Sequence, residues 1–241
     1  MAWITLSSPE RHNRLHAAMS AELRDCCMRS AQDPHVRAVV VEAEGDDFCA
    51  GAEDRLPSQT AQDYMVQMTV APALAALPVP VIAVLQGQAL DLGLELALAA
   101  DLRIAAQSAR LGLTNVLRGQ MPWDGGTQRL PRLVGQGRAL ELLLTGRLVD
   151  AEEAARIGLV HQVVATDQLP AVAAALAQEL AQRAPLALRY AKEAALRGLD
   201  HTLEQGLRLE ADLYFLLFST EDRLEGLKSW REKRPPSFQG R

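Results

Sequence analysis

A single glutamate stands in an otherwise apolar stretch that is predicted to be helical. Glu95 lies within the sequence DLGLELALAA (91–100) and is its only charged residue after the first one. A helix that is apolar on nearly every side is buried in the core. Because burial disfavours the ionised carboxylate, we expect the pKa of Glu95 to be raised, which suits a general acid or base. A structural pairing of Glu95 with a buried arginine or a backbone group is an equally good interpretation of this segment alone.

Two further segments bring small residues and polar groups together. The first, GDDFCAGA (45–52), follows a predicted strand, and its small residues would let backbone amides approach a ligand, although a tight turn explains it as well. The second, MPWDGGTQRL (121–130), places Trp123 and Asp124 on a loop before a helix. Asp124 is a candidate proton carrier or the N-cap of a helix that begins near Gly126, and Trp123 is a candidate pocket wall or core side chain.

These segments belong to a series of motifs that extends along almost the whole chain. The series consists of SPERHNRL (8–15), FCAGA (48–52), GQA (87–89) with Glu95 and Asp101, GGTQRL (125–130), LTG (144–146), AARIGLV (154–160) and EDRLEG (221–226). In this order and spacing the motifs resemble the enoyl-CoA hydratase/isomerase family, also called the crotonase superfamily.

The resemblance implies a fold of the α/β class, a crotonase-like spiral of ββα units with a helical C-terminal region. We expect residues 1–183 to form the crotonase-like ββα core and residues 184–241 to form a C-terminal helical oligomerisation region. The family assembly implied is a homotrimer or a homohexamer. The chain begins in what resembles the second strand of the family.

The resemblance also implies an acyl-CoA substrate and a site that polarises its thioester carbonyl. Matched by position, the oxyanion hole is formed by the backbone N–H groups of Ala52 and Leu92. An amide at a helix N-terminus would bring the positive end of the helix dipole to the developing charge. Family members usually carry glycine where this chain has Asp91 and Leu92, so we expect a narrower loop and a short or flat acyl group.

The expected acid/base groups depart from the family pattern. Glu95 matches the first of the two glutamates that family hydratases use, but the second falls on Asn115. An amide can hold a water molecule but cannot transfer a proton. Asp124, nine residues further on, is therefore a candidate replacement for the missing carboxylate. Trp123 would then line the acyl pocket and favour a flat or cyclic acyl chain.

The remaining substrate contacts follow from the same resemblance. Arg14 matches the region that contacts the adenine and phosphates of CoA, and Lys233 could reach a CoA phosphate, also from a neighbouring subunit. A solvated surface role is the plain alternative for both. The complete set of expected substrate-binding residues is Arg14, Leu15, Ala50, Glu53, Asp54, Gly93, Pro122, Trp123 and Lys233.

Composition excludes several classes of protein. The chain has 241 residues, 49% of them hydrophobic, and a net charge of −5, which is typical of a soluble globular protein and gives no basic surface for nucleic acid or membrane. The longest apolar run, 68–85, contains three prolines, so it is not expected to span a membrane. The first residues lack the features of a signal peptide, and none is expected. The three cysteines have no metal-ligand spacing and are expected as free thiols in a reducing, cytoplasmic setting. No metal and no redox cofactor is expected, since CoA is part of the substrate.

The elements that must position these residues alternate in the first half of the chain and are mostly helical in the second. Strands separated by helices favour a parallel sheet with crossover connections. Asp150 with Glu153 fits an N-terminal capping box. The apolar positions Leu203, Leu207, Leu213, Leu216 and Leu217 exceed one helix face, which favours burial in an oligomer. Strands are expected at 3–6, 36–43, 79–84, 102–105 and 159–164, and helices at 17–31, 60–77, 92–100, 168–183, 186–198, 202–218 and 221–230.

Three functions compete at this stage. The leading interpretation is an enoyl-CoA hydratase that adds water to an α,β-unsaturated acyl-CoA thioester through an enolate held in a backbone oxyanion hole. The second is an enoyl-CoA isomerase that moves a double bond with Glu95 alone. The third is a catalytically silent family member that binds acyl-CoA, which the asparagine at position 115 favours and the retained Glu95 disfavours.

Overall fold

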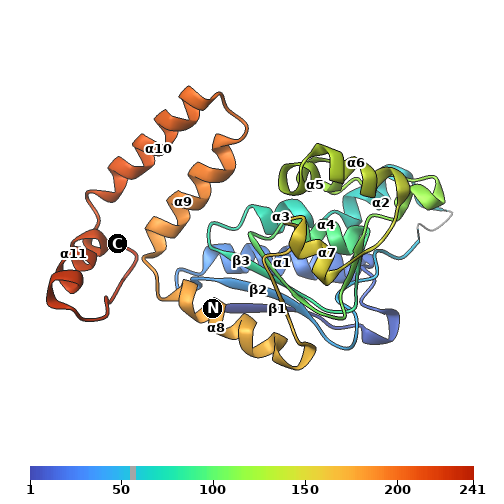
Figure 1. Ribbon diagram of the computed structural model, residues 1–241, viewed down its shortest axis with the longest axis horizontal. Coiled ribbons are helices and arrows are strands. Elements are labelled where there is room, and N and C mark those ends of the chain that lie inside the picture. The colour runs from blue at the N-terminus through green and yellow to red at the C-terminus, as the bar shows by residue number, and fades with distance from the viewer. Residues whose placement is uncertain (55–57) are drawn as a thin grey trace.

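The structure, a computed structural model, describes residues 1–54 and 58–241, and a parallel sheet lies at its centre (Figure 1). Five strands occur in the order β1-β2-β3-β5-β8, and every neighbouring pair is parallel. This confirms the predicted α/β class. The strands are β1 (Ala2–Leu6), β2 (Val39–Ala43), β3 (Val81–Leu85), β5 (Leu102–Ala106) and β8 (Gln162–Val164).

Helices cover both faces of this sheet, so its central strands are apolar throughout. Val40 and Ile82 face α8 (Leu169–Ala181) and form one cluster with its Ala173. Val39 and Val41, which point the other way, belong to the main core with the helices on the opposite face (Figure 1). Burial on both faces explains the unbroken β-branched runs that the sequence shows at these strands. The helices on that opposite face include α1 (Ala17–Gln32), α3 (Ala71–Ala75) and α4 (Leu92–Leu98).

A second, smaller sheet carries the elements that lead into the site. It has the order β4-β6-β7, with β4 paired parallel to β6 and β6 antiparallel to β7. Asp91 follows β4 directly and precedes α4, and Cys49 forms an isolated bridge to Ala89. The sequence reasoning missed this sheet because its strands are only two or three residues long: β4 (Gln88–Leu90), β6 (Arg110–Gly112) and β7 (Val149–Asp150).

The prediction of one helix over residues 60–77 is wrong. The segment forms two helices, α2 (Ala61–Met68) and α3, which are separated at Thr69 and Val70. The side chain of Asp150 accepts a hydrogen bond from the Glu153 amide, which confirms the predicted N-cap. The expected capping box is incomplete, because the Glu153 carboxylate accepts from Arg147 instead. The other elements of the core are the 3-10 turns η1 (Pro9–Arg11), η2 (Asn115–Arg118) and η3 (Thr166–Gln168) and the helices α5 (Gly126–Val134), α6 (Gln136–Thr145) and α7 (Ala151–Arg156).

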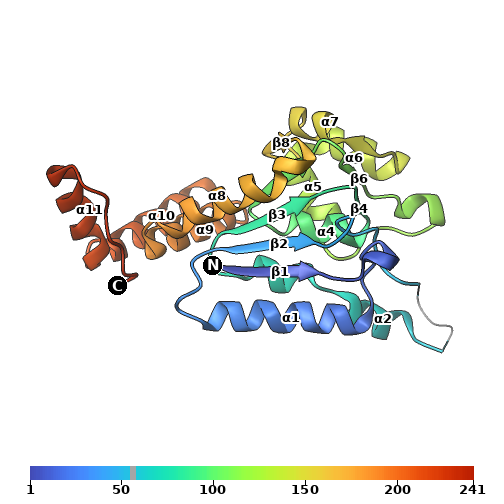
Figure 2. The same cartoon turned by 90° about the horizontal axis from the view of Figure 1, so that it is seen from below.

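The last three helices form an arm that extends away from the sheet (Figures 1 and 2). They are α9 (Pro185–Gly198), α10 (Leu203–Leu217) and α11 (Glu221–Glu232). In the arm Leu203 is 80% exposed, Phe215 75% and Trp230 80%, whereas Leu213 is buried. Within the described ranges no helix combines the length and apolar character needed to cross a membrane. An exposed apolar surface of this kind usually marks an interface, so the oligomerisation role of residues 184–241 stays a prediction.

We expect the protein to sediment as a trimer or hexamer of its 26.2 kDa chain, because the arm leaves large apolar side chains in water. Phe215→Asp should shift the protein toward smaller species, while the exposed and polar Glu210→Gln serves as the matched control. Analytical ultracentrifugation at micromolar concentration measures both. A single monomeric boundary for the unmodified protein would contradict the prediction.

Candidate active site

Glu95 is completely buried and has one free carboxylate oxygen. Its Oε1 atom accepts hydrogen bonds from the backbone N–H groups of Asp124 and Gly126, each at 2.8 Å. Its Oε2 atom is also buried, and no group in residues 1–54 or 58–241 pairs with it. Burial, more than the negative charge of Asp124, raises the pKa of Glu95 to about 7, in the direction expected from the sequence. The group can therefore both accept and release a proton near neutral pH.

Close packing of α4 against the segment that contains Cys49 fixes the position of Glu95. A Cβ atom on Gly93 would lie 2.3 Å from the carbonyl oxygen of Cys49 and 2.8 Å from its Sγ atom. Only glycine allows this approach, so the glycine at position 93 acts in packing and does not line the cleft described below. The leucines on either side of Glu95 are almost fully buried, which seals the helix into the core.

The two residues expected to form the oxyanion hole, Ala52 and Leu92, line one cleft. Leu92 is the first residue of α4, and Ala52 forms an isolated bridge with Leu15. Gly51 lies against Asp91, with a distance of 3.5 Å from its ideal Cβ position to the Asp91 Cβ. In the part of the chain that the structure describes, neither the Ala52 nor the Leu92 N–H donates to a protein acceptor.

Ala52 and Leu92 line a cleft of about 620 Å³, which we call the acyl cleft. Its aromatic wall is formed by Tyr64 and Trp123, whose ring centroids are 5.7 Å apart with planes inclined by 55°. A cleft of this volume, mostly apolar with a few polar groups, is typical of a small-molecule site. Glu95 is not itself exposed in the cleft but lies directly beneath the loop that carries Trp123.

Asn115 lines the acyl cleft from η2 and is 2% exposed. Its Oδ1 atom is buried with no partner among the described residues, as are Glu95 Oε2 and Trp123 Nε1. Only one other side-chain atom of those residues, Ser20 Oγ, is in the same condition. Buried polar atoms are nearly always hydrogen-bonded in folded proteins, so three such atoms around one cleft indicate that a water molecule or a polar ligand binds there.

The structure places the Asp124 carboxylate away from the acyl cleft. Its Oδ2 atom accepts hydrogen bonds from the amides of Val70 and Ala71, at 2.8 and 2.7 Å, and so caps the first turn of α3. The expected cap of the helix near Gly126 is wrong, because Gly125 precedes α5 without a side-chain cap. This geometry favours a structural role for the carboxylate over the proton transfer expected from the sequence.

Other expected substrate contacts divide into two groups. Arg14, Asp54, Pro122 and Trp123 line the acyl cleft, and Arg14 Nε donates to the Ala52 carbonyl at 3.1 Å. Of the residues that the structure describes around the cleft, the rest of the expected set lies outside the lining: Leu15, Ala50, Glu53, Gly93 and Lys233. Leu15 is fully buried, and Glu53 instead forms an ion pair with Arg11.

Lys233 is the C-cap of α11 in the arm, and α11 lies at the opposite end of the molecule from α2, which carries the cleft residue Tyr64 (Figure 2). A contact between Lys233 and CoA would have to come from a neighbouring subunit, and it stays a prediction. Among the cleft residues that sequence reasoning missed are Tyr64 on α2 and Arg118 on η2. Neither stands in a motif of the family, so no sequence signal pointed to them.

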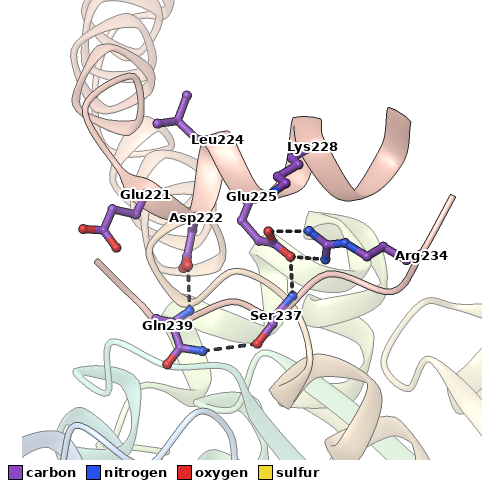
Figure 3. Close-up of a pocket in the computed structure, with 8 residues that line it drawn as sticks. All are labelled: Glu221, Asp222, Leu224, Glu225, Lys228, Arg234, Ser237 and Gln239. Atoms are coloured by element: carbon purple, nitrogen blue, oxygen red, sulfur yellow. Dashed lines mark hydrogen bonds and ion pairs between the residues drawn. The ribbon is translucent and has the colours of Figure 1, made fainter. Parts of the chain in front are cut away.

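A second pocket lies in the arm and is lined by several acidic residues (Figure 3). Glu225 accepts two hydrogen bonds from Arg234, at 2.5 and 2.9 Å, and Asp222 accepts from the amides of Gln239 and Gly240. The Arg234 guanidinium lowers the pKa of Glu225 to about 2. These carboxylates are occupied by hydrogen bonds from the C-terminal tail, so the EDRLEG motif fastens that tail to α11.

The structure shows no metal site and no disulfide in the residues it describes. No three histidine, cysteine, aspartate or glutamate residues in those ranges are grouped as ligands for a metal ion. Cys26, Cys27 and Cys49 are all free. Burial raises the pKa of the Cys49 thiol to about 12, which makes it unreactive at neutral pH.

Comparison with known proteins identifies the family of this chain. A family model described as enoyl-CoA hydratase/isomerase matches residues 1–241. The (E)-benzylidenesuccinyl-CoA hydratase of Thauera aromatica is 39% identical over 246 residues, which cover 100% of this chain and 96% of the relative. The human mitochondrial protein called enoyl-CoA hydratase domain-containing protein 2 is 40% identical and matches 99% of this chain and 85% of its own length.

A solved structure confirms the fold. The enoyl-CoA hydratase from Bacillus anthracis superposes with a TM-score of 0.96 at 40% identity and covers 99% of this chain and 95% of its own. The fold is thus the expected crotonase-like one, a mixed α/β architecture with a parallel sheet and many helices. The chain belongs to the enoyl-CoA hydratase/isomerase family, whose members act on acyl-CoA.

Asp124→Asn should leave activity within about tenfold of the unmodified enzyme, because an amide oxygen still caps α3, whereas loss of a general acid/base costs roughly 100-fold or more. Asp124→Ala removes the cap and should lower the free energy of unfolding by about 1 kcal/mol. Turnover assays and urea denaturation of the two variants measure these effects. Collapse of activity in the stable asparagine variant would return Asp124 to the role of proton carrier.

Burial of Glu95 predicts a stability that depends on pH. Between the unfolded-state pKa of 4.5 and the folded-state pKa of about 7, the folded protein holds a proton that the unfolded chain has released. Stability from this group is therefore complete below pH 4.5 and is lost as pH rises toward 7, by about 3 kcal/mol in total. Glu95→Gln should gain stability relative to the unmodified protein between pH 5 and pH 8. Urea denaturation at both values tests this, and an equal difference at the two pH values would contradict it.

Proposed function

We propose that this protein is an enoyl-CoA hydratase that adds water across the double bond conjugated to the thioester of an acyl-CoA. One observation carries the proposal: the buried Glu95, whose Oε2 atom has no partner in the described ranges, contacts the loop that carries Trp123 at the cleft lined by Ala52 and Leu92. Within those ranges neither the Ala52 nor the Leu92 amide donates to a protein acceptor. Such a site combines a proton-transfer group of neutral pKa with donors for a developing oxyanion. It is a catalytic arrangement, and the silent acyl-CoA-binding alternative gives no reason for it.

In the proposed reaction the thioester oxygen accepts hydrogen bonds from the Ala52 and Leu92 amides. Glu95 removes a proton from water, the water oxygen forms a bond to the β-carbon, and the electron pair of the double bond moves toward the thioester as an enolate. Glu95 then returns the proton to the α-carbon. One water molecule is consumed, and the carboxylate ends in its starting form. The pKa of about 7 suits both directions of proton transfer.

Asn115 takes the position where the resemblance places a second glutamate, and we propose that it orients the water. Its Oδ1 atom, buried and without a partner among the residues of the described ranges, can accept a hydrogen bond from that water. Because Glu95 supplies and recovers the proton, a second carboxylate is not required. The Asp124 carboxylate, which caps α3, does not enter the reaction.

We further propose that the acyl group is flat and aromatic. The Tyr64 and Trp123 rings form a wall of the cleft at which an aromatic acyl group can stack or meet an edge. The name of the Thauera aromatica relative, a hydratase of (E)-benzylidenesuccinyl-CoA, supports this choice, since a benzylidene group is aromatic. trans-Cinnamoyl-CoA is therefore the substrate we choose as a probe.

Isomerisation is the second candidate, and Asn115 is the observation that favours it. A single carboxylate can carry a proton from the α-carbon to the γ-carbon of a 3-enoyl thioester, which moves the double bond into conjugation with the carbonyl, and no water is needed. The two reactions use the same oxyanion hole and the same Glu95. They differ only in whether oxygen from water enters the product.

We expect trans-cinnamoyl-CoA or a short trans-2-enoyl-CoA to take up label in ¹⁸O-water, as read by mass spectrometry. Glu95→Gln should reduce kcat by roughly 100-fold or more and leave acyl-CoA binding largely intact, because it removes the proton-transfer group at constant volume. The exposed Glu210→Gln is the control. Shift of a 3-enoyl-CoA double bond without label would establish the isomerase, and binding without turnover of any of these thioesters would establish the silent member.

A further inference from the structure

Asp91 adopts a backbone conformation that side chains rarely take. Its φ is +48° and its ψ is −119°, a combination ordinarily reserved for glycine. The residue is 6% exposed and directly precedes Leu92, which lines the acyl cleft. Strain of this kind persists only where the surroundings hold it, and it is concentrated at functional sites.

The surroundings of the Asp91 carboxylate do hold it. Its Oδ1 atom accepts from the Thr114 amide at 2.6 Å, and Oγ1 of Thr114 lies 3.0 Å from both carboxylate oxygens. Its Oδ2 atom accepts from Arg118 Nη2 at 2.6 Å, while Arg118 Nη1 donates to Thr114 Oγ1 at 3.2 Å. We call Asp91, Thr114 and Arg118 the Asp91 cluster.

The Asp91 cluster joins two parts of the site. Leu92 follows Asp91 at the start of α4, and Asn115 follows Thr114 at the start of η2. The hydrogen bond from the Thr114 amide to the Asp91 carboxylate therefore fixes two neighbouring groups relative to each other. These are the Leu92 backbone amide, expected at the oxyanion hole, and the Asn115 side chain, which lines the same cleft. Preorganised donors of this kind need no rearrangement during the reaction.

The same arrangement introduces an electrostatic problem. A carboxylate beside the Leu92 amide opposes the negative charge that develops on the thioester oxygen there. Arg118, which lines the acyl cleft, is the cation that balances it. The Arg118 side chain is about half exposed, at 51%, so its ion pair contributes little to folding, and its effect falls on the charge in the site.

Resting on the proposed function, we propose that Asp91 is a positioning residue for the Leu92 oxyanion amide and that Arg118 neutralises the Asp91 carboxylate so that enolate charge can develop beside it. Arg118→Gln leaves that carboxylate uncompensated and should reduce kcat by on the order of tenfold or more with little change in KM. Asp91→Asn keeps an oxygen for the Thr114 amide and removes the charge. The double variant Asp91→Asn/Arg118→Gln should therefore recover most of the kcat that Arg118→Gln loses.

The experiment is this double-mutant cycle, with kcat and KM measured for trans-cinnamoyl-CoA and thermal unfolding measured for all four proteins. Arg118→Lys, which keeps the charge, should retain most of the activity. A rise in KM at unchanged kcat in Arg118→Gln would show that Arg118 contacts the substrate and would overturn the proposal. Equal losses of kcat in Arg118→Gln and the double variant would overturn it as well.

A spectroscopic measurement separates this proposal from the proposed function. Benzoyl-CoA has no enoyl double bond to hydrate, and the infrared band of its ¹³C-labelled thioester carbonyl reports hydrogen bonding at the oxyanion hole. We expect the downward shift of this band on binding to be smaller in Arg118→Gln than in the unmodified protein, and restored in the double variant. The same band shift in every variant contradicts the Asp91 proposal. If the band shifts change as expected but no enoyl-CoA is hydrated, only the proposed reaction is contradicted.

Discussion

The structure of the site depends on one constraint, the burial of the Glu95 carboxylate with only one of its oxygens satisfied. The apolar α4 helix and the contact of Gly93 with Cys49 hold the side chain in the core. The Asp124 and Gly126 amides occupy Oε1, and Oε2 has no partner in the described ranges. If both oxygens were paired, the pKa would fall and the group would be a structural anion. Burial instead raises its pKa to about 7, and the pairing of Oε1 alone lowers that pKa less than pairing of both oxygens would.

The loop above Glu95 is held from two sides, which explains why a carboxylate stands at position 124. The Asp124 amide binds Glu95, and its side chain binds the Val70 and Ala71 amides of α3. These hydrogen bonds tie the loop at Asp124 to both α3 and α4, and they fix the position from which Trp123 lines the acyl cleft. The Asp124 charge also contributes to the raised pKa of Glu95, so the residue influences the reaction without touching the substrate.

Sequence reasoning succeeded where the signal is local. The parallel strands and the buried α4 follow from continuous apolar runs, and the burial of Glu95 follows from its neighbours. It failed where the partner is distant: the break between α2 and α3 depends on Asp124, 54 positions away from Val70. The strands β4, β6 and β7 are too short to have a period. The tertiary contacts of Arg118 and Tyr64 leave no pattern in the sequence.

A site with one acid/base group demands more of its geometry than a site with two. In the proposed reaction Asn115 stands in place of a second carboxylate, so the water has to be held by groups that transfer no proton, and Glu95 has to reach both the water and the α-carbon. Small displacements between α4 and η2 would then cost rate directly, since reacting groups must meet within about 3–3.5 Å. The Asp91 cluster spans that junction. The strained backbone of Asp91 and the asparagine at position 115 are therefore connected. Because only Glu95 transfers a proton, the hydrogen-bonded link between α4 and η2 has to hold the reacting groups in place.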